Sequence, residues 1–284
     1  MAKKAFRFGV VTGGSPSRAA WLALAQRVEE LGYSSLLLPD VMGTPLAALT
    51  ALTVAATVTT KLRVGSFVFV NDYRNPALLA REIATLDQLS DGRVELGLGA
   101  GNWPSDYQQL GIPFDEAGVR VSRFAEGLSL IKQFFTNETV NFSGKYYSTQ
   151  GLRPLPRPVQ QPHPPILIGS AGRRMLRLAA READIILLVP PAEEKLGWIR
   201  EAAGERFEQL ELGQTAFGIE LTDSPVAATA AFSRMPIAEA RPMTTEQAVE
   251  HLLEQRERLG ISYIQIQERQ MENFAPVLAR LNGK

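Results

Sequence analysis

A glycine-rich segment at residues 94–104 carries the clearest chemical signal in the sequence. It reads Val-Glu-Leu-Gly-Leu-Gly-Ala-Gly-Asn-Trp-Pro. Because alternate side chains of a strand point to opposite faces, one face is expected to carry Val94, Leu96 and Leu98. The other face then carries Glu95, Gly97, Gly99 and Gly101. The missing side chains on that face would leave a cavity for a flat ligand, although glycines that serve only close strand packing would give the same pattern.

Residues 166–174 suggest an anion-binding turn. Small residues at 169–172 join an apolar strand to a helix that opens with Arg173 and Arg174. Free N–H groups at a helix N-terminus attract anions, so the turn is a candidate phosphate site. A plain strand-to-helix turn with solvated arginines is the alternative.

Two further segments place polar groups at strand ends. In residues 64–76, Phe67 and Phe69 could form a flat apolar wall of a binding site. The same residues fit an ordinary core strand before a capped helix equally well. Asp40 follows an apolar strand, where its carboxylate either faces the site or caps the next helix. Arg63 and Glu95 are expected to form an ion pair between neighbouring strands.

The sequence lacks the residues that metal sites and histidine-dependent catalysis require. The sequence has no cysteine and only two histidines, His163 and His251, so it offers no zinc-binding spacing and no histidine-centred triad. We therefore predict no metal site. His163 is expected to be structural in a proline-rich loop, and His251 to lie on the outside of a helix. Asn102, followed by Trp103 and a proline, does not fit a dinucleotide-binding turn.

Charge and hydropathy exclude further classes of function. Thirty basic residues balance thirty acidic ones, so no excess positive charge is available for nucleic acid or a membrane surface. Residues 41–60 carry no charge, but six of these twenty residues are threonine, which favours a buried helix over a membrane span. The N-terminus lacks the pattern of a signal peptide, and a cytoplasmic protein is expected.

Strand-like and helical patterns alternate along the chain. Eight strands are predicted, at 6–12, 34–38, 62–70, 94–99, 165–169, 185–189, 214–221 and 263–266. The helices are predicted at 18–31, 46–58, 76–89, 119–135, 173–181, 193–203, 245–259 and 270–282. This α/β alternation favours a single (βα)8 TIM barrel, a domain of residues 1–284, over an open doubly wound sheet. An excursion at 137–164, between strands four and five, is expected to form a hairpin beside the mouth of the barrel.

Together these segments resemble the luciferase-like monooxygenase superfamily, particularly its branch that depends on the deazaflavin coenzyme F420. The resemblance covers residues 6–190 well and 244–282 more weakly. It rests on the segments 73–82, 85–93, 95–101, 119–121, 144–147, 162–166 and 180–184.

The resemblance implies a barrel that binds a flavin or deazaflavin at its C-terminal mouth. It also implies a non-prolyl cis peptide between Phe67 and Val68, behind the cofactor ring. The residues implied along the cofactor are Phe67, Val68, Val70, Ala100, Gly101 and Asn102. Those implied at its phosphate end are Ala171, Gly172, Arg174 and Met175.

The sequence also departs from the family pattern. Val41 stands where many members carry a histidine after the aspartate, Asn75 replaces a second histidine, and Asn102 replaces a glutamate of the sugar-phosphate dehydrogenases. A glucose-6-phosphate substrate is therefore disfavoured, because the proton-handling groups are missing. Asp40 and Asn102 become the candidate catalytic residues, with Asp106 and Tyr107 as further polar candidates.

Three alternative functions remain open for this sequence. The first is an oxidoreductase that transfers hydride between F420 and an unidentified small organic substrate. The second is an FMN-dependent monooxygenase that uses oxygen. The third is a barrel without cofactor that serves as a binding or structural protein. The family suggests a homodimer, and a flavin or F420 reductase is expected to supply the reduced cofactor.

Overall fold

The protein folds as a closed barrel of eight parallel strands. The computed structural model describes residues 4–222 and 241–284. The strands follow the order β3-β2-β1-β13-β10-β9-β8-β5, and β5 pairs back with β3. The barrel strands are β1 (Arg7–Val11), β2 (Ser35–Leu38), β3 (Arg63–Ser66), β5 (Val94–Gly99), β8 (Ile166–Ser170), β9 (Ile185–Leu188), β10 (Glu211–Thr215) and β13 (Ile261–Gln267). The predicted (βα)8 barrel is thus confirmed.

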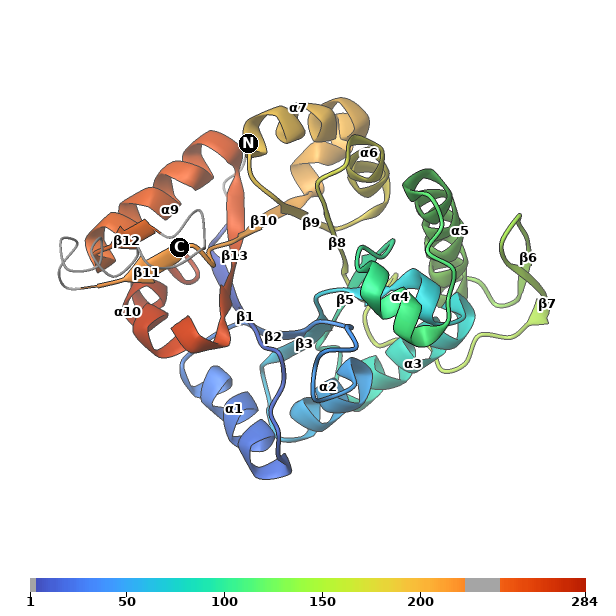
Figure 1. Cartoon of the computed structure of the whole chain (residues 1–284), viewed down its shortest axis with the longest axis horizontal. Coiled ribbons are helices and arrows are strands. Elements are labelled where there is room, and N and C mark those ends of the chain that lie inside the picture. The colour runs from blue at the N-terminus through green and yellow to red at the C-terminus, as the bar shows by residue number, and fades with distance from the viewer. Residues whose placement is uncertain (1–3, 223–240) are drawn as a thin grey trace.

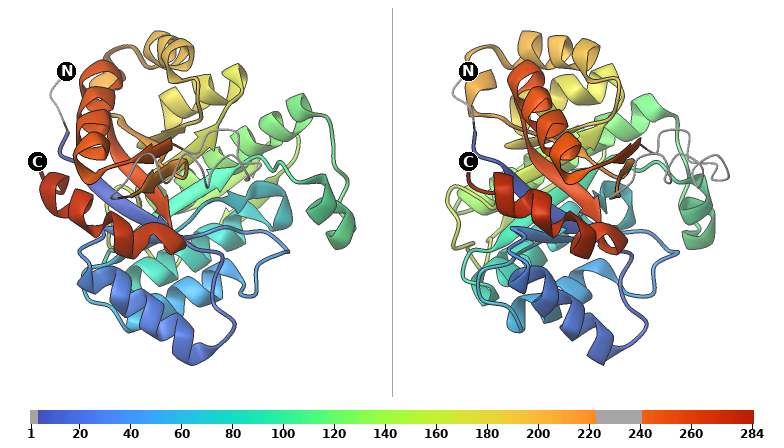
Figure 2. Two further views of the ribbon diagram at one scale, coloured as in Figure 1. Left: turned by 60° about the vertical axis from the view of Figure 1, so that its left-hand side comes forward. Right: turned by 90° about the vertical axis from the view of Figure 1, so that its left-hand side faces the viewer.

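Helices surround the barrel on its outside (Figures 1 and 2). Local signals set their ends: Thr244 and Gln247 form a capping box before α9, and Gly260 ends that helix with a left-handed backbone. The α-helices are α1 (Arg18–Glu30), α2 (Ala48–Thr57), α3 (Pro76–Leu89), α4 (Pro104–Leu110), α5 (Ala117–Thr136), α6 (Arg173–Glu182), α7 (Ala192–Ala203), α9 (Thr245–Leu259) and α10 (Met271–Leu281). The short helix α4 was not predicted from the sequence.

The third strand of the barrel is interrupted. The predicted strand 62–70 forms β3 and the two-residue β4 (Phe69–Val70), with a cis peptide bond between Phe67 and Val68. Gly65 pairs with Glu95 and Phe69 with Leu98, so this strand advances four residues while β5 advances three. The extra residue is a bulge. Its position matches the one that the family resemblance implied.

The seventh strand begins and ends earlier than predicted. Instead of 214–221, the barrel strand β10 covers Glu211–Thr215, and the chain then leaves the barrel wall. Ile219–Leu221 forms a separate strand, β11, which pairs in parallel with β12 (Arg241–Met243). A turn separates the two strands and is closed by a hydrogen bond from the Ile219 N–H to the Ala216 carbonyl.

The excursion at 137–164 contains the expected hairpin. Its strands β6 (Val140–Ser143) and β7 (Ser148–Leu152) are antiparallel and lie beyond α5, outside the barrel (Figure 1). Three backbone N–H groups of its turn, at 145–147, donate to the Glu126 carboxylate on α5. The Tyr147 hydroxyl accepts a hydrogen bond of 2.9 Å from Asn71 Nδ2, which follows β4. The turn of the hairpin thus contacts the end of β4 at the mouth of the barrel.

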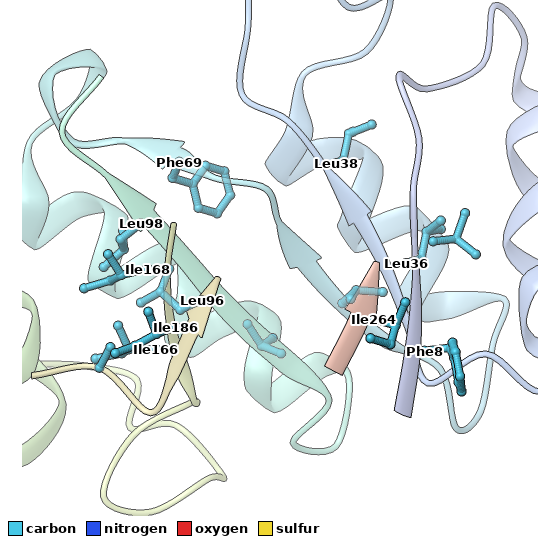
Figure 3. Packing of buried hydrophobic residues seen from close by; sticks show 14 of the residues in the cluster. Phe8, Leu36, Leu38, Phe69, Leu96, Leu98, Ile166, Ile168, Ile186 and Ile264 are labelled. Atoms are coloured by element: carbon cyan, nitrogen blue, oxygen red, sulfur yellow. The ribbon is translucent and has the colours of Figure 1, made fainter. Parts of the chain in front are cut away.

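Apolar side chains form two layers of core. The larger layer fills the space between the strands and the helices and includes Val94, Leu96 and Leu98, as predicted (Figure 3). The smaller layer lies inside the barrel and contains Leu37, Leu167, Ile185, Leu187 and Tyr263. Five residues of α2, within the uncharged stretch 41–60, are buried in the larger layer. No helix among the described residues is long and apolar enough to cross a membrane.

Candidate active site

The mouth of the barrel is the end at which the carboxyl termini of its strands meet. Here the apolar side chains of Val11, Phe67 and Val68 are only partly buried, and they pack on the inner core layer. The Phe67 ring lies 6.4 Å from that of Phe217, between ring centroids. Phe67 and Val68 therefore present an apolar surface at the end of a barrel where TIM-barrel enzymes hold their ligands.

Asp40 lies at this mouth, but it caps no helix. Its two carboxylate oxygens accept hydrogen bonds of 2.9 and 3.0 Å from the Arg74 guanidinium, and one also accepts the Val70 N–H at 3.2 Å. Such a bidentate pair fixes both partners in a defined geometry. Asp40 thus ties the end of β2 to β4 and to the segment that follows it.

Tyr73 stands between two carboxylates, a position that the sequence did not single out. Its hydroxyl lies 3.5 Å from an oxygen of Asp106, which also accepts the Met42 N–H at 3.1 Å. Burial, followed by the charges of Asp106 and Asp40, raises the pKa of Tyr73 to about 12. Tyr73 is consequently a neutral hydrogen-bond donor at physiological pH.

A second cluster of charges lies around Asp72. Arg123 donates to both of its oxygens, at 2.8 and 2.7 Å, and Tyr107 donates to one of them at 2.9 Å. Burial and the Asp72 charge raise the pKa of Tyr107, so its hydroxyl keeps its proton. Arg123 also pairs with Asp115 at 2.7 Å. The cluster joins α4, α5 and the end of β4 into one hydrogen-bonded unit.

The glycines of β5 do not leave the open cavity that was predicted. A Cβ on Gly97 would lie 2.0 Å from the Ser66 carbonyl oxygen, and one on Gly99 would lie 2.7 Å from the Val68 side chain. A Cβ on Gly101 would lie 2.0 Å from the Tyr107 hydroxyl. These positions therefore admit the bulge at Phe67–Val68 and the Tyr107 ring. Asn102 and Trp103, which follow these glycines, are exposed.

The turn between β8 and α6 has the features of an anion site. Ala171, Gly172 and Arg174 are exposed, and a Cβ on Gly172 would meet no atom nearer than 4.0 Å. The first hydrogen bond within the helix runs from the Leu176 N–H to the Gly172 carbonyl. The N–H groups of residues 173–175 therefore have no acceptor within the helix. The Arg174 guanidinium is bound at 2.8 Å to both Gly118 O and Ser122 Oγ of α5. The Met175 side chain is buried in the core, which leaves only its backbone for a ligand.

The opposite end of the barrel interior contains the predicted ion pair. Arg63 Nε lies 2.9 Å from Glu95, which also receives hydrogen bonds from Arg7 and from the Tyr263 hydroxyl. Burial alone would raise the pKa of Glu95, but Arg7 and Arg63 outweigh it and hold that pKa below its usual value.

Neither histidine occupies a metal site. The ring nitrogen Nδ1 of His163 lies 3.0 Å from the Pro164 carbonyl oxygen, in the loop before β8. His251 lies on α9, outside the barrel. Within residues 4–222 and 241–284, no group of three or more acidic or histidine side chains is arranged for a metal ion.

A family model described as luciferase-like monooxygenase matches residues 5–277 of the sequence. This match covers almost the whole barrel. The chain belongs to the luciferase-like monooxygenase family.

The chain is also similar to a curated relative and to solved structures of the same fold. An uncharacterised protein of Mycobacterium tuberculosis is 32% identical over 184 residues, which cover 57% of this chain and 62% of that protein. This luciferase-like chain thus spans about three fifths of the length of the curated relatives that it matches. The monooxygenase RslO1 from Streptomyces bottropensis superposes with a TM-score of 0.79 at 23% identity, over 96% of this chain and 99% of that one. A coenzyme F420-dependent tetrahydromethanopterin reductase from Methanopyrus kandleri superposes with a TM-score of 0.81 at 19% identity, over 98% and 100%.

The departures of this luciferase-like chain from the family pattern have local structural consequences. Asn75, in the place of a family histidine, is the N-cap of α3, and its Oδ1 accepts the Ala77 N–H at 2.9 Å. Val41 carries no proton-handling group; Asp40 directly precedes it, and Asp106 accepts the N–H of the following residue, Met42. Tyr73 lies in the segment 64–76, but its contact with Asp106 depends on α4, a helix that the sequence did not predict.

Proposed function

We propose that this protein is an oxidoreductase that holds coenzyme F420 at the mouth of its barrel and exchanges hydride with a small organic substrate. The observation that carries the proposal is the bulge at Phe67–Val68. It presents partly buried apolar side chains to the mouth, and on the same barrel the exposed N-terminus of α6 lies at the end of β8. An apolar surface near an anion-binding turn suits a flat ring with a phosphate-bearing tail.

The residues present fit such a cofactor. Phe67, Val68 and Val70 would support the ring, and Ala100, Gly101 and Asn102 would line its edge. The open space at Gly172 and the backbone N–H groups of Arg174 and Met175 would receive the phosphate, together with Ala171, and the exposed Arg174 guanidinium would add its positive charge. When bound, a deazaflavin supplies the carbon that accepts or releases hydride.

The polar side chains of the mouth would then position the substrate. Because Asp40 is held in a bidentate pair with Arg74, we assign it an electrostatic and positioning role. Tyr73 keeps its proton at neutral pH and can donate it in a hydrogen bond to a substrate oxygen. Asn102 is exposed beside the apolar surface, where its amide can orient the substrate.

A second candidate is an FMN-dependent monooxygenase. It is favoured by one feature of the mouth: Asp40 and Asp72 are both engaged with arginines, so neither offers a free acid for hydride chemistry on a carbonyl. The fold likeness to both a monooxygenase and an F420-dependent reductase accommodates either cofactor. A reductase that supplies the reduced cofactor and a homodimeric state belong to both candidates.

Cofactor titration tests the proposal. Purified protein is titrated with F420 and with FMN, and the intrinsic fluorescence of each cofactor is followed. We expect saturable binding of F420 at micromolar concentration and weaker binding of FMN. Tight FMN binding without F420 binding would reverse the order of the two candidates, and binding of neither cofactor would support the barrel without cofactor. A screen of reducible and oxidisable compounds with the cofactor that binds would then identify the substrate.

A further inference from the structure

Gln265 is a buried amide without any hydrogen-bond partner. It lies on β13 and is completely inaccessible to solvent. Its neighbours Ile264 and Ile266 belong to the outer core layer, and Tyr263 belongs to the inner one, so the Gln265 side chain points into the barrel. Neither its Nε2 nor its Oε1 has a partner. Among the described residues, no other buried side-chain amide has both of its polar atoms unpaired.

Such a group calls for an explanation. Buried polar side chains of native proteins almost always find a partner, because an unpaired one has lost its water without compensation. Tyr263, one level further from the mouth, follows this rule, because its hydroxyl bonds to both Ser35 and Glu95. Among the described residues, the other unpaired buried side-chain atoms are single atoms of Arg120, Arg256 and Ser262, so Gln265 differs in that both of its polar atoms lack a partner.

The surroundings of Gln265 are apolar and leave room for its amide. A Cβ added to Gly213, on the neighbouring strand β10, would lie 3.2 Å from Gln265 Nε2 and 2.8 Å from Leu187 Cδ2. Gly213 thus provides the space in which the amide sits. On the other side, Gln265 pairs in register with Gly9, and Val11 is the next inward residue of β1 toward the mouth. Val11 is partly exposed, so a single layer separates the amide from the mouth, and this layer has to open before a ligand can reach the amide.

The unpaired atoms define the chemistry of the missing partner. A primary amide offers one acceptor and one donor side by side. Its complement is an N–H next to a carbonyl, as in an imide or a lactam. The pyrimidinedione ring shared by flavins and deazaflavins has this arrangement on one edge.

We propose that Gln265 hydrogen-bonds the imide edge of the ring cofactor and so sets how deeply the ring enters the barrel. This inference rests on the proposed function, because it requires that a flavin or deazaflavin binds at the mouth. It adds a residue of the last strand to the site, opposite the bulge at Phe67–Val68. Gln265 would act as a binding and positioning residue, without a part in proton transfer.

The test removes each side of the proposed contact in turn. The Kd values of F420, FMN and N3-methyl FMN are measured by fluorescence titration for the wild-type protein and for Gln265→Leu. In the wild-type protein, we expect N3-methylation to weaken FMN binding about tenfold, because the methyl group blocks the imide N–H. Gln265→Leu should weaken binding of F420 and of FMN by a similar factor and bind FMN and N3-methyl FMN equally well.

Two controls separate this effect from a general disturbance. Gln214→Leu changes a glutamine of the neighbouring strand β10. Gln214 lies on the outer face of that strand, like Leu212, and this variant should leave all three Kd values unchanged. Without ligand, Gln265→Leu should unfold at the same temperature as the wild-type protein or a higher one, since it removes an unpaired buried amide.

Each remaining outcome overturns the inference. If Gln265→Leu binds both cofactors like the wild-type protein, or if the methyl group still weakens binding to this variant, Gln265 does not contact the imide. A lower unfolding temperature of the free variant would mean that the amide is satisfied within the protein. If the wild-type protein binds neither F420 nor FMN, the proposed function fails together with the inference. If it binds them but Gln265→Leu binds them equally well, only the inference fails.

Discussion

At the closed end of the barrel interior, Glu95 is bonded to Arg7, Arg63 and Tyr263, whereas nearer the mouth neither amide atom of Gln265 has a partner. Both groups are buried and both face the barrel axis, so burial alone does not decide whether a polar group is satisfied. In TIM barrels the amino-terminal end contributes stability and the carboxyl-terminal end binds ligands. The Glu95 network accordingly serves stability, whereas the unpaired amide of Gln265 lies toward the ligand-binding end, where Asp40 and Asp72 are themselves paired with arginines.

The largest expected effect is a loss of stability when the Glu95 network at the amino-terminal end of the barrel is removed. Glu95→Ala leaves Arg7 and Arg63 without their buried partner and should lower the free energy of unfolding by about 3–5 kcal/mol. Urea denaturation followed by circular dichroism measures the loss. As a control, Glu254→Ala removes an exposed partner of Arg258 and should change it by less than about 0.5 kcal/mol. Equal losses in the two variants would contradict the stabilising role of the buried network.

The next effect concerns the rigid part of the mouth. Gly101→Ala places a Cβ where the Tyr107 hydroxyl lies, at a backbone φ of +82°, and should cost about 2–4 kcal/mol from strain and overpacking. Gly111→Ala is the matched control, because its φ of +66° is also left-handed but no atom lies within 4 Å of the added Cβ. It should cost only about 1–2 kcal/mol. If both variants lose the same stability in urea denaturation, Tyr107 does not occupy the Gly101 space.

A smaller effect is expected at the anion-binding turn. Arg174→Ala should lower the free energy of unfolding by about 1 kcal/mol, because the exposed side chain gives up its two hydrogen bonds to α5. It should nevertheless weaken FMN binding about tenfold, the worth of one charge-assisted hydrogen bond. Riboflavin, which lacks the phosphate, should bind this variant and the wild-type protein alike. Arg177→Ala, on the same helix but bonded to Glu201, serves as the control. A similar loss with riboflavin would show that Arg174 does not act on the phosphate.

The smallest effect is a pH dependence. The pKa of Tyr73 is raised from 10.0 to about 12, so between these pH values the folded protein holds a proton that the unfolded chain has lost. The contribution of Tyr73 to stability is complete below pH 10 and disappears as the pH rises toward 12. Tyr73→Phe should therefore make the decline of stability over this range less steep, as followed by urea denaturation at each pH. Parallel curves for the two proteins would mean that Tyr73 is not held between Asp106 and Asp40.

The sequence predicts the parts of this structure that depend on local periodicity. Alternation along 94–99 gives both the outer face with Leu96 and the inner position of Glu95, and the adjacency of strands three and four gives its pairing with Arg63. These features follow from the regular geometry of strands. The position of the bulge at Phe67–Val68 follows from the family resemblance rather than from the residue pattern.

The mouth is less predictable because its contacts join loops from different strands. Arg74 reaches Asp40 across 34 residues, and the Tyr107 hydroxyl fills the space at Gly101 from an unpredicted helix. The open cavity expected at the glycines was wrong for this reason. The unpaired state of Gln265 depends on its neighbours in several strands, so no short stretch of sequence reveals it.

The neighbourhood of β1 has a consequence for how the chain folds. This strand lies between β2 and β13, and its register with β13 joins residues 7–11 to residues 263–267. During synthesis, one edge of the first strand therefore stays without its native partner until residues 263–267 have emerged from the ribosome. An unpaired edge invites association with other strands. Nascent chains of this protein are accordingly expected to depend on chaperones that shield this edge.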